Sequence, residues 1–300
     1  MGAVRVTEEF SARILSATAD ERVQASWGNN AVDIDILGPL SVSCEGRTIG
    51  VRASKVRAML ATLALEPGHV VSHVELADEL WAGHPVGNPR NALQAHATRV
   101  RKVLGLPAGD AALLRAVPNG YLLNVSRDRI DGNRFLDHAV RGSEALAGEP
   151  ERALRHLEAA LGLWRGPALL DAGDGLRCRS AGALFEERRL TVWEDLASAR
   201  LILGDESRAI AELRQLTAQY PLRERFCELL MLALYRTGRQ SDALELFRLT
   251  QRRLDEELGI QPAEPLQRRH AEILAHDPAL SHPGVLWGRR EPGRDGLPTG

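Results

Sequence analysis

The chain has 300 residues, of which 44% are hydrophobic, and a formal net charge of −2. This length predicts about two domains, and the apolar share allows each of them to bury a core. A net charge near zero excludes a broadly basic protein, so any signal for a polyanionic partner has to be local.

The cysteines and the apolar runs indicate the compartment. The three cysteines, Cys44, Cys178 and Cys227, are odd in number and far apart, which argues against a disulfide framework. No run approaches the roughly 18 apolar residues of a membrane span. The start of the chain also lacks the basic-then-apolar pattern of a signal peptide. We therefore expect a cytoplasmic protein with no membrane partner.

The first regular pattern begins at Val32, and we expect residues 1–31 to form a poorly ordered N-terminal extension. Residues 32–37 and 40–44 alternate apolar and polar side chains, as half-buried strands do. Turn-forming Gly-Pro and Glu-Gly pairs follow these two runs, and a third short strand is expected over 47–51. The sequence thus predicts a small antiparallel sheet.

Two helices are expected next. Ser54 is placed to cap the first helix, which ends by Pro67-Gly68. Ser72-His-Val-Glu75 has the spacing of a capping box, in which the hydroxyl accepts from the N3 amide and the glutamate reaches back. The second helix therefore starts there and runs to about Leu80, and a loop rich in Gly and Pro follows it.

The stretch 88–105, NPRNALQAHATRVRKVLG, predicts a third helix with two different faces. Asn88 is a good N-cap and Pro89 suits the first turn. One face is an apolar stripe made of Leu93, Ala97, Val100 and Leu104. The other face is polar and basic, made of Arg90, Asn91, Gln94, Thr98, Arg99, Arg101 and Lys102. No acidic residue occurs between Glu79 and Asp110.

The polar face has two interpretations. It suits a DNA major groove, where Arg can bind guanine, Asn and Gln can bind adenine, and further cations can bind phosphates. The alternative is a solvated basic helix face, which is the usual fate of such residues. The flanking elements decide between the two interpretations.

The next segment is a predicted hairpin. Residues 113–117 and 121–125 are expected strands around the turn Pro118-Asn119-Gly120. A sheet, three helices and a hairpin in this order predict a winged helix-turn-helix, whose recognition helix starts at Pro89. Arg115 and Asn119 are the polar candidates of the wing for DNA contact, and ordinary hairpin surface is the alternative for both.

Residues 32–125 resemble the DNA-binding domain of OmpR-type response regulators, through the words ELW at 79–81, NALQAHATRVRKVLG, and NGYLL at 119–123. The resemblance implies base contacts at Gln94, Ala95 and Arg99. It implies DNA-backbone contacts at Trp81, Asn91, His96, Thr98 and Arg101, and it places Tyr121, also in the DNA-binding set, at the close of the wing. The basic face itself adds Arg90 and Lys102 to the predicted set. For Trp81 the alternative is a core aromatic, and Val117 and Pro118 stand where the family's wing often carries an arginine.

Other chemistries find no support in the sequence. His69 and His73 do not share a helical face, and no thiol or carboxylate cluster joins them, so we expect no metal site. The chain has no P-loop, no G-x-S-x-G and no CxxC pattern. We therefore expect no cofactor, no catalytic residue and no enzymatic activity.

The second half is helical in pattern from Ile130, where Asp131 or Asn133 can cap the first helix. It also contains an internal repeat. Gly204-Asp-Glu-Ser-Arg-Ala and Gly238-Arg-Gln-Ser-Asp-Ala lie about 34 residues apart, which is the tetratricopeptide (TPR) period. Gly148 begins a third copy of the skeleton, with Ala at +5 and an apolar residue at +9. Stacked helical repeats of this kind usually bind a partner.

The second half resembles the bacterial transcriptional activation domain. The matching words are LWRGPAL from Leu163, PLRER from Pro221, LLMLALYRTGR from Leu229 and ELGIQP from Glu257. A winged helix followed directly by that domain is the layout of the Streptomyces antibiotic regulatory protein family.

The resemblance to this family implies a transcriptional activator of secondary-metabolite gene clusters. Such an activator binds tandem direct repeats near the −35 element of double-stranded promoter DNA. It does so as a homodimer or as side-by-side copies, and it contacts RNA polymerase holoenzyme, including the sigma factor, through the loop Ala82–Gly87. The expected location is the cytoplasm, in association with the nucleoid.

The predicted fold class is therefore mainly α, with an α+β winged helix-turn-helix at 32–126 and an all-α TPR-like domain at 127–277. A disordered tail is expected over 278–300. The alternative function is a TPR-like adaptor or sensor that binds an effector or a protein, with the winged helix acting as a repressor or an interaction module.

Overall fold

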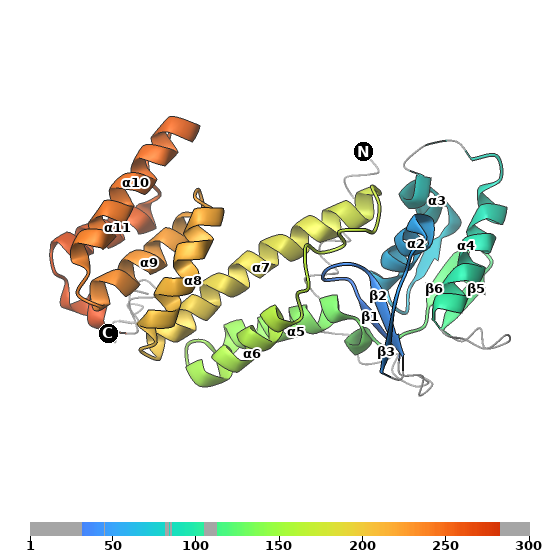
Figure 1. Cartoon of the computed structure of the whole chain (residues 1–300), viewed down its shortest axis with the longest axis horizontal. Coiled ribbons are helices and arrows are strands. Elements are labelled where there is room, and N and C mark those ends of the chain that lie inside the picture. The colour runs from blue at the N-terminus through green and yellow to red at the C-terminus, as the bar shows by residue number, and fades with distance from the viewer. Residues whose placement is uncertain (1–31, 45, 82–83, 85, 105–112, 283–300) are drawn as a thin grey trace, which may run out of the picture. The chain divides into compact units, whose positions relative to one another are not determined.

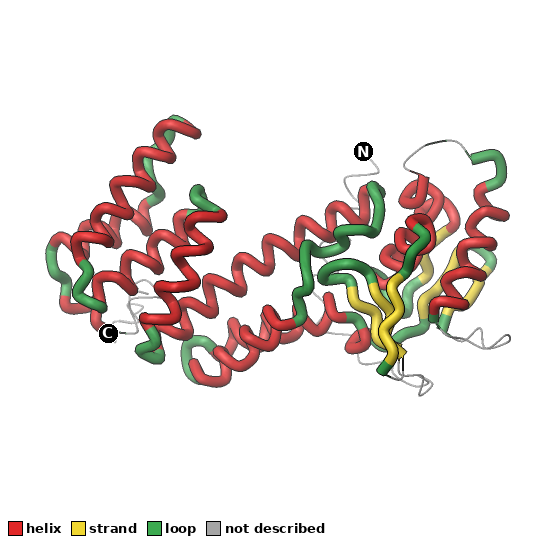
Figure 2. The backbone as a smooth tube through the Cα atoms, viewed as in Figure 1, coloured by secondary structure: helices red, strands yellow, loops and turns green. Residues whose placement is uncertain are grey.

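The computed structural model describes residues 32–44, 46–81, 84, 86–104 and 113–282. It is mainly helical, with strands only in the N-terminal part of these residues (Figures 1 and 2). This confirms the predicted fold class. The chain divides into two compact units, residues 1–141 with 156–192 and residues 142–155 with 193–300. None of the helices in the described ranges is both long and apolar enough to cross a bilayer.

The first unit begins with an antiparallel sheet in the order β1-β2-β3. Its strands are β1 (Val32–Asp35), β2 (Ser41–Cys44) and β3 (Arg47–Gly50). The alternating pattern predicted these strands, although each is one or two residues shorter than expected. Val32 and Ile34 of β1 and Val42 of β2 are almost fully buried, so the inward face of the sheet carries a core.

The winged helix follows the sheet. Its helices are α2 (Ser54–Ala64), α3 (His73–Trp81) and α4 (Pro89–Val103), and its strands are β4 (Val70–Ser72), β5 (Leu114–Val117) and β6 (Gly120–Leu123). The strands form a second sheet in the order β4-β6-β5. The sequence predicted only the hairpin, because three residues of β4 are too few to show a periodic pattern.

The helix caps were predicted with mixed success. At the start of α3, the Glu75 carboxylate accepts from the Ser72 amide at 2.8 Å, and the Ser72 hydroxyl accepts from the Glu75 amide at 3.2 Å. This confirms the capping box. The expected cap at Ser54 was wrong: Ser54 is already helical, and the N-cap is Ala53 without a side-chain hydrogen bond.

The first unit also contains segments of the predicted activation domain. They come from α5 (Asp131–Ala145), α6 (Pro150–Gly162) and the long α7 (Leu176–Ile202), and the short 3-10 helix η2 (Arg127–Arg129) precedes them. The LWRGPAL word lies between α6 and α7. Its Trp164 packs edge-on against Phe135, and Arg165 donates to the Pro39 carbonyl at 3.0 Å. The word therefore joins the second-half helices to the N-terminal sheet.

Asp131 has a different role from the expected helix cap. Its carboxylate accepts from the Ile36 amide at 2.7 Å and the Leu37 amide at 3.1 Å, and the residue is 1% exposed. It satisfies backbone groups after β1, 94 and 95 residues away in the chain. Burial, the largest cause, raises the pKa of this carboxyl above its ordinary value although both hydrogen bonds lower it.

The second unit is built from paired helices. They are α8 (Glu206–Gln219), α9 (Glu224–Arg236), α10 (Gln240–Leu258) and α11 (Glu264–Leu274), with the 3-10 helix η3 (Pro278–Ser281) at the end. Ala209 and Ala243, the small residues of the repeat, are fully buried, and Pro221 falls between α8 and α9. Gly204 and Gly238 adopt φ values of 76° and 75°, which explains glycine before each repeat helix.

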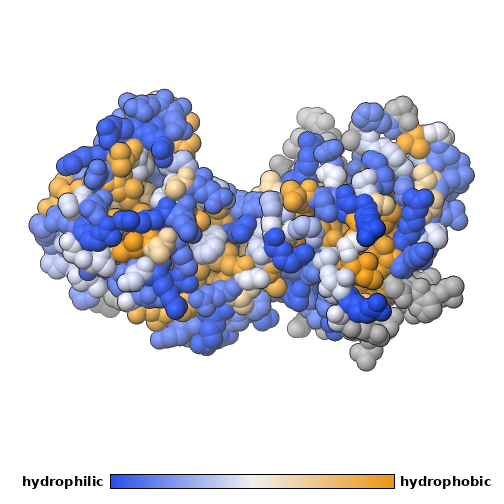
Figure 3. Space-filling view, in the orientation of Figure 1, coloured by the Kyte–Doolittle hydropathy of each residue, from blue (hydrophilic) through white to orange (hydrophobic). Residues whose placement is uncertain are grey.

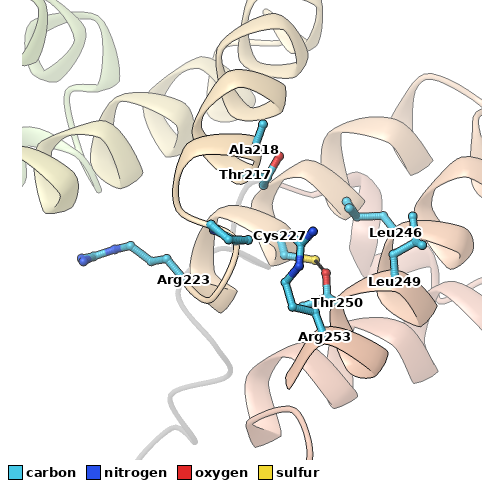
Figure 4. A pocket seen from close by; sticks show the side chains of 9 residues that line it. Thr217, Ala218, Arg223, Cys227, Leu246, Leu249, Thr250 and Arg253 are labelled. Atoms are coloured by element: carbon cyan, nitrogen blue, oxygen red, sulfur yellow. Dashed lines mark hydrogen bonds between the residues drawn. The ribbon is translucent and has the colours of Figure 1, made fainter. Parts of the chain in front are cut away.

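Two further features complete this unit. A cavity of about 230 Å³ lies between α8, α9 and α10, with Leu246 and Leu249 on one side and Arg223 directed away from it (Figure 4).

The prediction of a disordered tail from residue 278 was wrong for its first residues. Leu280 is fully buried and its carbonyl accepts from Arg236 at 2.8 Å, so residues 278–281 belong to the folded unit.

Candidate nucleic-acid interface

Local sequence signals and a buried stripe position α4. The Asn88 side chain accepts from the Asn91 amide at 3.1 Å and Pro89 opens the helix, which confirms both capping predictions. Leu93, Ala97 and Val100 are fully buried against α2 and α3. The stripe fixes the rotation of α4 about its axis and thus which side chains face outward.

The outward face of α4 carries most of the predicted DNA-binding residues. The exposed ones are Arg90, Asn91, Gln94, Ala95, Thr98, Arg99 and Lys102. None of the α4 cations forms an ion pair with an acidic residue in the described ranges. Arg99 and Gln94 are separated by five positions, and the Thr98 hydroxyl donates to the Gln94 carbonyl at 3.0 Å. The helix therefore presents amide side chains and arginines that pair with no carboxylate among the described residues.

Two α4 arginines are partly committed to the wing. Arg90 donates through Nη2 to the Pro118 carbonyl at 3.0 Å. Arg101, half-buried, donates through Nε and Nη2 to the Leu114 carbonyl at 3.2 Å each. Sequence reasoning placed both residues only on the DNA-facing side. The structure adds that they tie the recognition helix to the hairpin.

Trp81, His96 and Lys55 form a second group, which we call the Trp81 cluster. The rings of Trp81 and His96 are 6.2 Å apart between centroids, and both residues are half-buried. The Lys55 ammonium donates to the Leu80 carbonyl beside Trp81. Lys55 was missed from the sequence, because one lysine near the start of a helix carries no signal of its own.

Burial and nearby cations change the pKa of His96. Burial, then Arg99 and Lys55, lower the pKa of His96 below its usual value. Its Nδ1 is buried and has no hydrogen-bond partner among the described residues. The lowered pKa favours the neutral imidazole, which can approach a phosphate as an N–H donor.

The predicted DNA-binding residues of the wing differ in exposure. Arg115 and Asn119 are exposed, and the Asn119 carbonyl accepts from the His73 amide at 2.8 Å. Tyr121 is only 5% exposed, and its ring lies edge-on to His73 with centroids 5.5 Å apart. Burial raises the pKa of the Tyr121 hydroxyl. Little of Tyr121 can reach a DNA backbone, so its main role here is in the wing core.

Glycine is required at the wing turn. A Cβ on Gly120 would lie 2.0 Å from the Val71 carbonyl oxygen, because β4 and β6 pair there.

Around the wing and elsewhere in the described ranges, no three His, Cys, Asp or Glu side chains gather as metal ligands. On the face shown in Figure 3, hydrophilic side chains predominate and apolar ones form separate patches.

Comparisons with known families match both halves of the chain. The model described as "Transcriptional regulatory protein, C terminal" matches residues 51–123. The model described as "Bacterial transcriptional activator domain" matches residues 130–274. The first match contains α2 to β6, and the second contains the helices from α5 to α11.

Individual relatives match most of the chain. The chain is 57% identical to the transcriptional regulator RedD of Streptomyces coelicolor over 87% of its own length and 75% of that protein's. It is 35% identical to the regulatory protein DnrI of Streptomyces peucetius, covering 84% of this chain and 96% of that protein.

A solved structure supports the fold. The structure of Mycobacterium tuberculosis EmbR, in complex with a low-affinity phosphopeptide, has a TM-score of 0.79 and 33% identity, over 83% of this chain and 66% of that one. With the winged helix, the repeat helices and these relatives in view, the chain belongs to the Streptomyces antibiotic regulatory protein family of DNA-binding transcriptional regulators.

Proposed function

We propose that this regulator reads promoter DNA with the outward face of α4. Arg99 and Gln94 read base edges in the major groove, with Ala95 in apolar contact between them. The observation that carries the proposal is the acid-free outward face, on which Arg99 has no hydrogen bond or ion pair to any described residue. A free guanidinium can form both bonds to a guanine, whereas one already paired with a carboxylate cannot.

Around this base-reading strip, other side chains hold the DNA backbone. They are Trp81, Arg90, Asn91, His96, Thr98, Arg101 and Lys102 on the helices and Arg115 and Asn119 on the wing, while Tyr121 supports the wing from its core. Lys55 joins them because its ammonium donates to the carbonyl of Leu80, the residue before Trp81. Contacts of this kind set the position and orientation of the protein and carry no base information.

The promoter site consists of tandem direct repeats near the −35 element, bound by side-by-side copies of the chain. Family membership supports this arrangement, as does one recognition helix in the described part of each chain. The loop Ala82–Gly87 contacts RNA polymerase and its sigma factor. Of this loop only His84, Val86 and Gly87 lie within the described residues. The regulated genes are a secondary-metabolite cluster, and the effect is activation.

Footprinting of the purified full chain on the promoters near its own gene tests the proposal. The salt concentration is stated and varied, because phosphate contacts make affinity fall steeply with salt. We expect protection of evenly spaced repeats beside the −35 element and increased transcription by polymerase in vitro from the same templates. No protection at any salt concentration at which the protein stays folded would overturn the proposal. Protection with reduced transcription would leave DNA reading intact and overturn activation.

A further inference from the structure

Glu79, in the last turn of α3, caps a helix far along the chain. Its Oε1 accepts from the Cys178 amide at 2.7 Å and its Oε2 accepts from the Arg177 amide at 3.0 Å. These amides lie in the first turn of α7, where backbone N–H groups have no partner within the helix. A carboxylate is the favoured partner there, because it meets the positive end of the helix dipole.

The surroundings are shaped around this contact. Glu79 is 7% exposed, and a Cβ on Gly175 would lie 2.1 Å from its Cδ, so only glycine leaves room for the carboxylate. The Arg177 side chain pairs with Glu66 and with Glu75, the latter at 2.5 Å. The start of α7 is thus held by α3 and by the residues after α2.

The same turn of α3 carries the Trp81 cluster. The Leu80 carbonyl, one residue after Glu79, accepts from Lys55. Trp81 follows, with its ring against His96 of the recognition helix. One turn of helix therefore has the α7 contact on one side and the predicted phosphate contacts on the other.

We infer that Glu79 is a positioning residue for DNA binding. By holding the first turn of α7, it sets the last turn of α3 and so places Trp81 and Lys55 for the DNA backbone. DNA affinity then depends on a contact with the activation-domain part of the chain. The inference rests on the proposed function, since the Trp81 cluster is a phosphate site only if α4 lies on DNA.

The test is Glu79→Gln in the full chain, which keeps the size of the side chain and replaces one acceptor by a donor that faces an N–H. Dissociation constants for a promoter duplex carrying the direct repeats are measured over a series of salt concentrations. We expect binding about tenfold weaker, the ratio that corresponds to about 1.4 kcal/mol. We also expect the slope of log K against log salt to fall by about 0.9, the value for one lost phosphate contact.

A spectroscopic measurement tests positioning directly. In the chain labelled with 5-fluorotryptophan, the resonance assigned through Trp81→Phe should shift in Glu79→Gln without DNA. Gly175→Ala approaches the same carboxylate from the other side and leaves its charge in place, so it should reproduce both the shift and the lower salt slope. If Glu79→Gln does not fold, Gly175→Ala alone provides the test of positioning.

Arg177→Met is the matched control. It removes the pairs with Glu66 and Glu75 but leaves the backbone amide that Glu79 accepts from. It should lower the melting temperature and change DNA affinity by less than about twofold, which is well under 1 kcal/mol. If all variants lose affinity only in proportion to stability, Glu79 is merely structural and the inference is wrong.

Two remaining outcomes separate the inference from the proposed function. Wild-type protein that does not bind the repeats would overturn the proposed function. Wild-type protein that binds, with Glu79→Gln and Gly175→Ala matching its affinity, salt slope and Trp81 resonance, would overturn the inference alone.

Discussion

Arginine has different partners in the recognition helix and in the repeat helices. On α4 the arginines contact only backbone carbonyls or nothing in the described residues. In the second unit several arginines pair with carboxylates, as Arg223 does with Glu194 and Arg200 with Glu212. The difference shows that an arginine side chain remains available to bind a polyanion where no Asp or Glu lies near it. Four predictions test this comparison.

The largest expected effect lies in the second unit. Arg269 and Glu228 are 5% and 6% exposed at the side chain and lie 3.1 Å apart, between α11 and α9. Arg269→Met should destabilise the protein by about 3 kcal/mol, the lower end for a broken buried pair, because Arg225 still pairs with Glu228. Denaturant unfolding of the full chain measures this loss.

The half-exposed pair Arg253–Glu257 provides the control. Arg253→Met should cost less than about 0.5 kcal/mol, since exposed pairs contribute little. Both variants, when folded, should keep wild-type DNA affinity. Weaker DNA binding by folded Arg269→Met would contradict a purely structural role for the repeat arginines.

The second effect is on base reading. Arg99→Ala should weaken binding to the promoter repeats by about 1–3 kcal/mol and relax the preference at one base pair, because a two-bond contact is lost. Competition binding against single-base variants of the repeat measures both effects. Arg248, an exposed arginine on α10, is the matched control, and Arg248→Ala should leave affinity unchanged. Equal site preference in Arg99→Ala and wild type would remove Arg99 from base reading.

The third effect separates the two roles of Arg101. Arg101→Lys keeps the charge but loses the forked contact with the Leu114 carbonyl, so it should cost about 1 kcal/mol of stability and leave the salt slope unchanged. Arg101→Ala should lose the same stability and also about 0.9 of the salt slope. If wild type, Arg101→Lys and Arg101→Ala have equal slopes of log K against log salt, then Arg101 only anchors the wing and does not contact a phosphate.

The smallest effect is a pH dependence at His96. In the free protein the pKa of His96 lies below its usual value, and a phosphate beside the ring would raise it. DNA binding then takes up a proton, so affinity should rise as the pH falls through the pKa of the bound state and lose this gain above it. Between pH 7.5 and 6 we expect about a threefold change, equivalent to about half a pKa unit. His96→Gln should flatten this part of the profile, and an unaltered profile would place His96 away from phosphate.

Much of the fold and of the candidate site follows from local patterns. The stripe from Leu93 to Leu104, the capping box at Ser72 and the N-cap at Asn88 all use residues within a few positions of one another. The repeat spacing likewise located α8 and α10, because buried Ala209 and Ala243 recur at a fixed period. Helices are predictable where their contacts are short in sequence.

The structural features that the sequence missed or predicted wrongly share a physical cause. Strand β4 exists because it pairs with β6, fifty residues later in the chain, and its own residues have no pattern that requires a strand. Ser54 has the residue type of a cap but lies inside α2. Leu280 is buried against the second unit although its neighbours are typical of a disordered tail. Each depends on what packs there, which local composition does not contain.

The sequence by itself determined that a basic, acid-free helix with one apolar face precedes a hairpin and a set of helical repeats. It also determined which side chains face outward, because helical periodicity and the apolar stripe leave one rotation of α4. Only the tertiary structure decided which of these side chains are already occupied. Arg101 is bound to β5, Tyr121 is buried in the wing, and Glu79 caps α7 nearly a hundred residues away. Hydrogen-bond partners are chosen by proximity in space, and spacing along the chain does not record it.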